Sequence, residues 1–149
     1  MKDKTNKEKT LKLSYDKPPI WEEANALFKL EELNMGTIFT FGDTLYNPFQ
    51  VRMTGDLFVH ERTHAEQHQW DGTVAGLWWK RYLADPEFRL EQEIEAYANH
   101  YKYIAHNEKS RDKVFQNLLF FAKSLGGPMY GNIISPTEAM ARIKEKAKT

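Results

Sequence analysis

The most constraining feature of this 149-residue chain is the pair His60 and His64, with Glu61 directly after the first histidine. On an α-helix, residues four apart lie one above the other on the same face, so a helix here would bring both imidazoles together. Two imidazoles at that spacing can bind one Zn²⁺, with Zn–N bonds of about 2.0–2.1 Å. Residues 57–68 are therefore predicted to form a helix that presents two metal ligands.

Glu61 is predicted to border the face of the two histidines, because successive helical residues are rotated by about 100°. From there its carboxylate could accept a proton from a metal-bound water, which is the role of the general base in metal-assisted hydrolysis. The alternative is a solvated polar helix that carries two histidines by chance, since short motifs also occur at random. A third ligand in the right place would favour the metal site.

The composition limits which ligands and partners are available. The chain has no cysteine, so any metal must be held by histidine and carboxylate groups. Hydrophobic residues make up 41% of the chain and aromatic residues 13%, which favours one folded domain over disorder. The formal net charge of zero gives no electrostatic reason to expect nucleic acid as a partner. Because we see neither a secretory signal nor a long apolar run, we expect a cytoplasmic protein with no membrane partner.

Periodicity and turn residues predict a mostly helical α+β fold. We expect a flexible polar tail over residues 1–17, in which the alternation of Leu11, Leu13 and Tyr15 is also typical of a short strand, and a single domain over residues 18–149. A small β-hairpin, residues 37–41 and 44–46, should pack beside the metal-binding helix. It could bind an extended peptide at its edge or merely cap the core. Helices are predicted at about 20–30, 57–69, 74–83, 87–106, 114–125 and 136–143.

The third ligand is sought in the helix predicted over residues 87–106, which contains Glu91, Glu93 and Glu95. Its apolar stripe is formed by Leu90, Ile94, Tyr97, Tyr101 and Ile104. Glu93 lies about 60° from the centre of that stripe, whereas Glu91 and Glu95 lie about 100° and about 140° away. A metal ligand must point inward from the edge of the core. Glu93 is therefore the predicted third ligand.

Three further side chains are candidates for roles around the metal. Tyr97 and His100 follow Glu93 on the same edge, and either could donate a hydrogen bond to an oxyanion or orient a ligand. Tyr97 could equally be an ordinary core tyrosine. His68 continues the face of the two motif histidines, but a fourth protein ligand would close the position that a catalytic zinc keeps open. We therefore expect His68 to support the site or the fold.

These residues resemble the gluzincin metallopeptidases, in which the paired histidines are followed by a glutamate on a later helix. The chain is also similar to small zinc-peptidase-like proteins of tailed bacteriophages and prophages, in residues 39–48, 60–67, 82–97 and 125–131. In gluzincins the glutamate three residues before an alanine is the ligand, which corresponds to Glu93 ahead of Ala96. Many relatives have aspartate after that alanine, where this chain has Tyr97. The carboxylate that orients a histidine is therefore either missing or supplied from elsewhere.

The resemblance implies a minigluzincin-like domain that hydrolyses a bond in a peptide or protein substrate. Zn²⁺ would be held by His60, His64 and Glu93. Glu61 would activate the metal-bound water, and the oxyanion would be stabilised by Tyr97, His100 or Tyr101.

A second hypothesis belongs to another class. The chain would then be a phage virion or assembly protein with phage structural proteins as partners, located in the host cytoplasm or the virion. Its zinc would be structural or its catalysis lost, and the fourth position would be filled by His68 or by a residue of the N-terminal tail.

Overall fold

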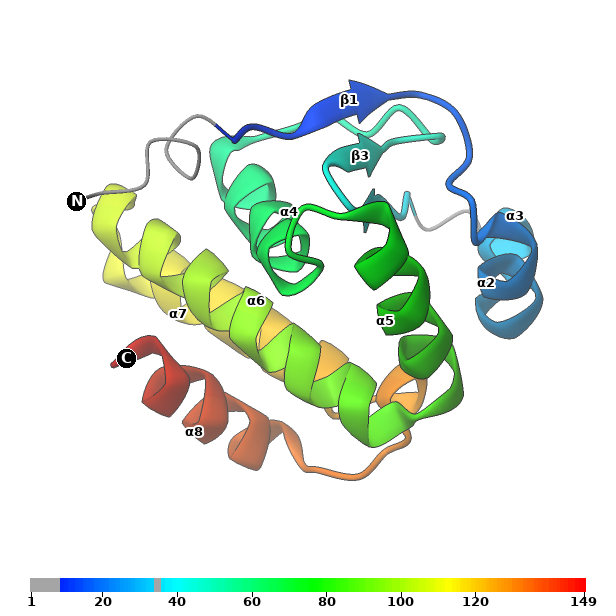
Figure 1. The fold of residues 1–149 in the computed structure, drawn as a ribbon. Helices are drawn as coiled ribbons and strands as arrows, with labels where there is room; N and C mark the ends of the chain where they lie inside the picture. Colours follow the sequence, from blue (N-terminus) through cyan, green and yellow to red (C-terminus); the bar gives the residue numbers. More distant parts are fainter. Residues whose placement is uncertain (1–8, 34–35) are drawn as a thin grey trace.

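The chain folds into a mostly helical α+β structure, as the sequence predicts. The computed structural model describes residues 9–33 and 36–149 (Figure 1). Its elements in chain order are β1 (Lys12–Ser14), α2 (Trp21–Phe28), α3 (Leu30–Leu33), β2 (Phe39–Phe41), β3 (Thr44–Tyr46), α4 (Gly55–Gln67), α5 (Gly72–Ala84), α6 (Pro86–Asn107), α7 (Arg111–Leu125), η1 (Pro128–Tyr130) and α8 (Pro136–Ala147). None of the helices within the described ranges is long and apolar enough to cross a membrane.

The sheet contains the predicted hairpin and one further strand. Strands β2 and β3 pair antiparallel around a turn in which Gly42 has φ +64°, a conformation that glycine adopts without strain. Strand β1 pairs parallel to β3, which gives the order β1-β3-β2. Because residues 12–14 belong to the sheet, the expectation of a flexible tail over residues 1–17 is wrong for this part, and the alternation of apolar residues was the better guide. Residues 1–8 lie outside the described residues.

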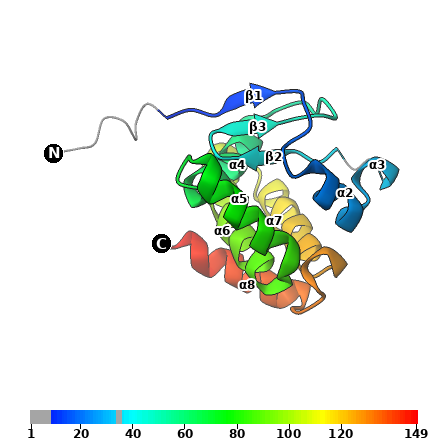
Figure 2. The ribbon, with the colours of Figure 1, turned by 45° about the vertical axis from the view of Figure 1, so that its right-hand side comes forward.

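Helices α4, α6 and α8 are stacked below the sheet. In both views α4 lies between the sheet and α6, and α8 lies on the opposite side of α6 from α4 (Figure 1 and Figure 2). Strand β2 packs directly against α4, as expected for a hairpin beside the motif helix. The motif helix is therefore enclosed by the sheet on one side and by α6 on the other.

Two hydrophobic clusters flank the motif helix. The lower cluster joins α6, α7, η1 and α8, and it contains the apolar stripe predicted for α6, with Tyr97 and Tyr101 partly buried at its margin. The upper cluster joins α2, α3, β2 and α5. Its buried members are Ile20, Trp21, Ala24, Leu30, Phe39, Trp78, Trp79 and Tyr82. Helix α4 contributes no member to either cluster, so its buried polar face lies between two apolar regions.

Most helix ends follow local capping chemistry. Asp85 caps α6 by accepting hydrogen bonds from the backbone N–H groups of Glu87 at 3.0 Å and Phe88 at 3.3 Å. Asp71 caps the start of α5 by accepting hydrogen bonds from the backbone N–H groups of Thr73 at 2.8 Å and Val74 at 3.0 Å. Thr54 stands at the N-cap of α4 but makes no capping bond with its side chain. Helix α7 begins before its predicted start, at Arg111, and α8 continues past its predicted end, to Ala147, because exposed polar turns carry no hydrophobic periodicity.

Candidate metal centre

The two motif histidines meet Glu93 at one point between α4 and α6. The Nε2 atoms of His60 and His64 each lie 3.0 Å from the same carboxylate oxygen, Oε1 of Glu93. All three residues are buried, with exposed fractions of 7%, 5% and 8%. This burial contradicts the alternative of a solvated polar helix. The helical spacing predicted from the sequence therefore brings these three side chains together.

The choice among the three glutamates of α6 follows from how this helix packs. Glu93 borders the buried stripe beside Leu90 and Ile94, and points toward α4. Glu91 is exposed, and Glu95 is half-buried and accepts a hydrogen bond from the side chain of Gln67 at 2.8 Å. Neither belongs to the three-residue cluster.

The cluster has the chemistry of a metal site. One ligand atom from each of the three residues lies within 4.8 Å of the others. A tetrahedral zinc site with bonds of about 2.0–2.1 Å separates its ligand atoms by about 3.3–3.4 Å, close to the 3.0 Å between Glu93 and each histidine. Within the described ranges, the only cationic groups within 4.0 Å of the buried carboxylates of Glu61 and Glu93 are histidines. A metal ion would supply the charge that two buried carboxylates require.

Two of the three candidate ligands are held by neutral groups. The hydroxyl of Tyr82 on α5 donates to Oε2 of Glu93 at 2.6 Å, which leaves only Oε1 facing the histidines. Nδ1 of His64 lies 2.7 Å from the side-chain oxygen of Gln67. The amide nitrogen of Gln67 in turn donates to the backbone oxygen of Gln92 at 3.1 Å. These contacts fix the direction of each ligand atom.

His60 is held differently, through a second histidine. Its Nδ1 lies 3.1 Å from Nδ1 of His100 on α6, and Nε2 of His100 lies 2.6 Å from Oδ2 of Asp56 at the start of α4. His100 therefore contacts the side of His60 that faces away from Glu93. This position does not suit a hydrogen-bond donor to an oxyanion, but it suits a residue that orients a ligand.

Glu61 lies beside the cluster, on the side of the sheet. Its Oε1 accepts a hydrogen bond from the hydroxyl of Thr40 on β2 at 2.9 Å, while its Oε2 lies 3.9 Å from Nε2 of His60. The backbone oxygen of Thr40 accepts a hydrogen bond from the indole N–H of Trp79 at 2.8 Å. Helix α5 thus covers the outer edge of β2. This favours the interpretation that the hairpin caps the core, rather than the interpretation that its edge binds an extended peptide.

The remaining candidates occupy three distinct positions. The ring of Tyr97 packs against His60, with 4.5 Å between ring centroids. His68 does not belong to the cluster of His60, His64 and Glu93, and its Nδ1 accepts the backbone N–H of Gly42 at 3.1 Å. Its Nε2 has no hydrogen-bond partner among the described residues, and its ring packs against Trp78.

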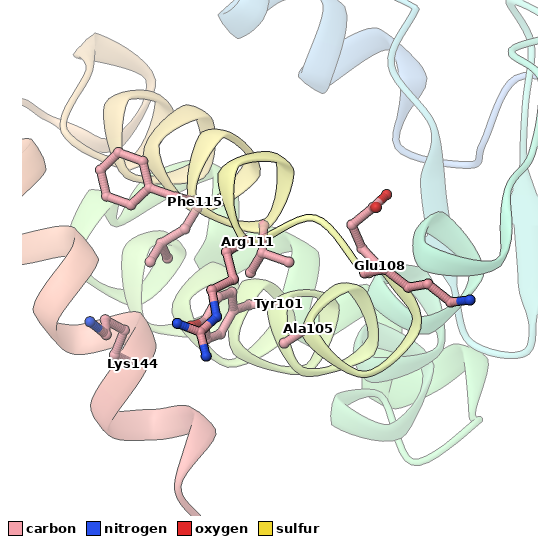
Figure 3. A pocket seen from close by; sticks show the side chains of 9 residues that line it. Tyr101, Ala105, Glu108, Arg111, Phe115 and Lys144 are labelled. Atoms are coloured by element: carbon pink, nitrogen blue, oxygen red, sulfur yellow. The ribbon is translucent and has the colours of Figure 1, made fainter.

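Tyr101 lines a separate pocket of about 440 Å³ between α6, α7 and α8. Arg111 from α7 and Lys144 from α8 also line this pocket (Figure 3). None of the residues that line it belongs to the metal cluster, so Tyr101 is not placed to act on a ligand bound there.

Burial and neighbouring charges set the protonation of these groups. Burial raises the pKa of Glu61. Burial opposes the charged form of His64, but the Glu93 carboxylate outweighs it and raises the pKa of His64 to about 9. Burial and the charge of His60 lower the pKa of His100 to about 4, against the opposing effect of Asp56. Burial lowers the pKa of His68 to about 3.

Sequence reasoning did not identify Tyr82 or Thr40 as residues of the site, and it did not identify the contact between Asp56 and His100. Thr40 alternates with Phe39 and Phe41, which indicates that its side chain leaves the sheet on one face, and Tyr82 follows Trp78 by one helical turn. These patterns indicate burial, but not contact with α4 or α6.

Comparison of the chain with known protein families, with curated proteins and with solved structures finds no match.

Proposed function

We propose that this chain is a zinc-dependent metallopeptidase of the gluzincin type, in which His60, His64 and Glu93 hold the metal. The proposal rests on the buried meeting of two imidazole nitrogens and one carboxylate oxygen beside a further carboxylate, Glu61. Two histidines and one glutamate are a ligand set of catalytic zinc sites, which keep a fourth position free. Zn²⁺ bound there would lower the pKa of a water molecule and polarise a peptide carbonyl.

Glu61 is the proposed general base. Thr40 holds one of its carboxylate oxygens, and the other faces the space beside His60. Burial raises the pKa of Glu61, and a base whose pKa is closer to neutral transfers protons more effectively near pH 7. Glu61 would accept the proton of the attacking water and then deliver it to the leaving amine.

Tyr97 is the proposed donor to the oxyanion. It packs against His60, whereas His100 contacts the back of that ring and Tyr101 lines another pocket. Burial, together with the charge of Glu93, raises the pKa of Tyr97, so its hydroxyl keeps the proton that it would donate. The proposed substrate is a peptide or protein segment that reaches the metal without pairing along β2, since Trp79 occupies the carbonyl of Thr40.

The competing function is a phage virion or assembly protein in which the same residues hold a structural zinc. The observation that favours it is the low exposure of the cluster, since Glu61 and the three candidate ligands are all at most 8% exposed. A structural zinc also requires a fourth ligand. His68, one of the residues considered for that position, lies outside the cluster of the three candidate ligands.

The two functions are separated by substituting Glu61. We expect Glu61→Gln to bind one zinc per chain and to lose at least about 100-fold in peptide cleavage, because general-base catalysis contributes about 10²–10⁴-fold. Glu66→Gln is the matched control, since Glu66 lies on the same helix but is exposed. Metal content is measured on the purified proteins, and cleavage on a peptide library.

Each contrary result has a separate meaning. A zinc-loaded wild type that cleaves no peptide would reject the peptidase and favour the structural site. Wild-type protein purified without metal from zinc-replete medium would reject the zinc site itself. His64→Ala should lose the zinc while Glu66→Gln keeps it.

A further inference from the structure

The two nitrogens of His60 face two different partners. Nε2 faces Oε1 of Glu93 at the metal cluster, and Nδ1 faces Nδ1 of His100 at 3.1 Å. The other nitrogen of His100 faces Oδ2 of Asp56 at 2.6 Å. A continuous row of polar contacts therefore runs from the metal cluster through two imidazoles to a carboxylate.

The direction of each hydrogen bond in this row follows from its two ends. A histidine nitrogen that binds a metal carries no proton, so the ring proton of His60 must be on Nδ1, from which it donates to His100. Nδ1 of His100 then accepts, which leaves its own proton on Nε2. The carboxylate of Asp56 accepts this proton, and one assignment satisfies every contact.

The surroundings hold the row in place. The His100 ring packs against Phe121 with 4.5 Å between ring centroids, and only 4% of His100 is exposed. The hydroxyl of Thr54 donates to Oδ1 of Asp56 at 2.6 Å, so that Oδ2 is left for His100. Asp56 and His60 lie one helical turn apart on α4, and His100 comes from α6. The row thus spans the same two helices as the proposed metal ligands.

We propose that Asp56 and His100 are positioning residues that hold His60 with Nε2 unprotonated and directed at the metal. This inference rests on the metal site of the proposed function but not on peptide hydrolysis. The two histidines are oriented through different groups. His64 contacts the amide of Gln67, which donates in turn to Glu95, whereas His60 contacts a second imidazole, His100, which contacts the Asp56 carboxylate.

The first test is the zinc affinity of the full chain, measured by competition with a chelator. Substitution of residues that orient a ligand typically weakens metal binding by about 10–100-fold, and we expect this loss for His100→Phe and Asp56→Asn. His100→Gln should recover part of the affinity, because a side-chain oxygen can accept the proton of His60 Nδ1. Ile104→Ala is the control, since it removes core packing from α6 without touching a polar contact of the row.

The second test reads the protons directly in the zinc-loaded wild type, so that it does not depend on a variant that folds. Long-range ¹H–¹⁵N spectra should place a proton on Nδ1 of His60 and on Nε2 of His100. A proton on Nδ1 of His100 would overturn the proposal.

The proposal would also be overturned if His100→Phe and Asp56→Asn bound zinc with affinities within twofold of the wild type. An equal loss of zinc affinity in Ile104→Ala would overturn it as well. A wild type that binds zinc but cleaves no peptide would reject the peptidase alone. Wild-type protein that binds no zinc would reject both.

Discussion

At the scale of single residues, the candidate centre depends on the atoms that face away from the metal. Each of the three proposed ligands uses its second polar atom for a hydrogen bond to a different chemical group. The partners are an imidazole for His60, an amide for His64 and a phenol for Glu93. Metal ligands whose second atom is fixed in this way lose little freedom when the metal binds. The site is therefore organised by its surroundings as well as by the three ligands.

Tyr82 offers a test of this organisation with the removal of one oxygen atom. In Tyr82→Phe, Oε2 of the buried Glu93 carboxylate loses its donor, which typically costs about 1–3 kcal/mol of folding stability. The carboxylate is also free to rotate, so we expect zinc affinity to fall by at least about tenfold. Thermal unfolding and chelator competition measure the two effects. Tyr101→Phe, which alters the separate pocket, is the control and should change neither the stability nor the zinc affinity. An unchanged zinc affinity in Tyr82→Phe would show that Tyr82 does not position Glu93.

His64 gives the metal-free protein a pH-dependent stability. Its pKa is about 9 in the folded chain against an ordinary value of 6.5, so folding favours its protonated form. The resulting stabilisation is fully present below pH 6.5 and is lost as the pH rises through about 9. We therefore expect the melting temperature of metal-free protein to fall between these pH values, measured in the presence of a chelator. His64→Gln should lack this part of the fall, and an identical pH profile in both proteins would contradict the assignment.

At the scale of secondary structure, the sequence was most informative where a pattern repeated over several turns. Helix α6 was predicted to within one residue at each end, and its apolar stripe identified both the buried face and Glu93 at its border. Strand β1, with only three residues, offered too short a pattern to outweigh the polar segment around it. Helix α7 begins at Arg111, earlier than its apolar residues indicate, because Ser110 caps it.

The candidate site was predictable as far as it depends on one helix at a time. The spacing of His60 and His64, and the direction of Glu93, follow from helical geometry alone. Thr40, Tyr82 and the contact between Asp56 and His100 join elements that are distant in sequence. Such contacts depend on how the helices and the sheet pack, which no local periodicity specifies. A carboxylate behind His60 is likewise visible only in the fold, where Asp56 at the start of α4 contacts His100 of α6.

At the scale of the whole molecule, the candidate centre lies where the parts of the fold meet. Helix α4 supplies two ligands, α6 supplies the third, and Tyr82 connects α5 to that third ligand. Nearby, the buried Arg89 donates to the backbone oxygens of Tyr82 at 2.8 Å and Leu83 at 3.1 Å, and to that of Met129 in η1. This arginine joins α5, α6 and η1 through carbonyl groups. The polar contacts thus connect the upper and lower hydrophobic clusters, which share no buried residue.

Zinc binding should therefore stabilise the entire fold. A ligand that binds only the folded state at 1,000 times its Kd adds about 4.1 kcal/mol, because the stabilisation equals RT ln(1 + [L]/Kd). For a chain of this size, each kcal/mol of added stability raises Tm by about 2–4 °C, so we expect zinc to raise Tm by about 8–16 °C. Calorimetry with and without zinc measures the shift, which should be lost in His64→Ala. A similar rise in Tm for His64→Ala would mean that zinc acts elsewhere. If the rise is lost in this variant, zinc stabilises the protein by joining α4 to α6. Because a single Tm reports the unfolding of both hydrophobic clusters, that result would show that both are stabilised.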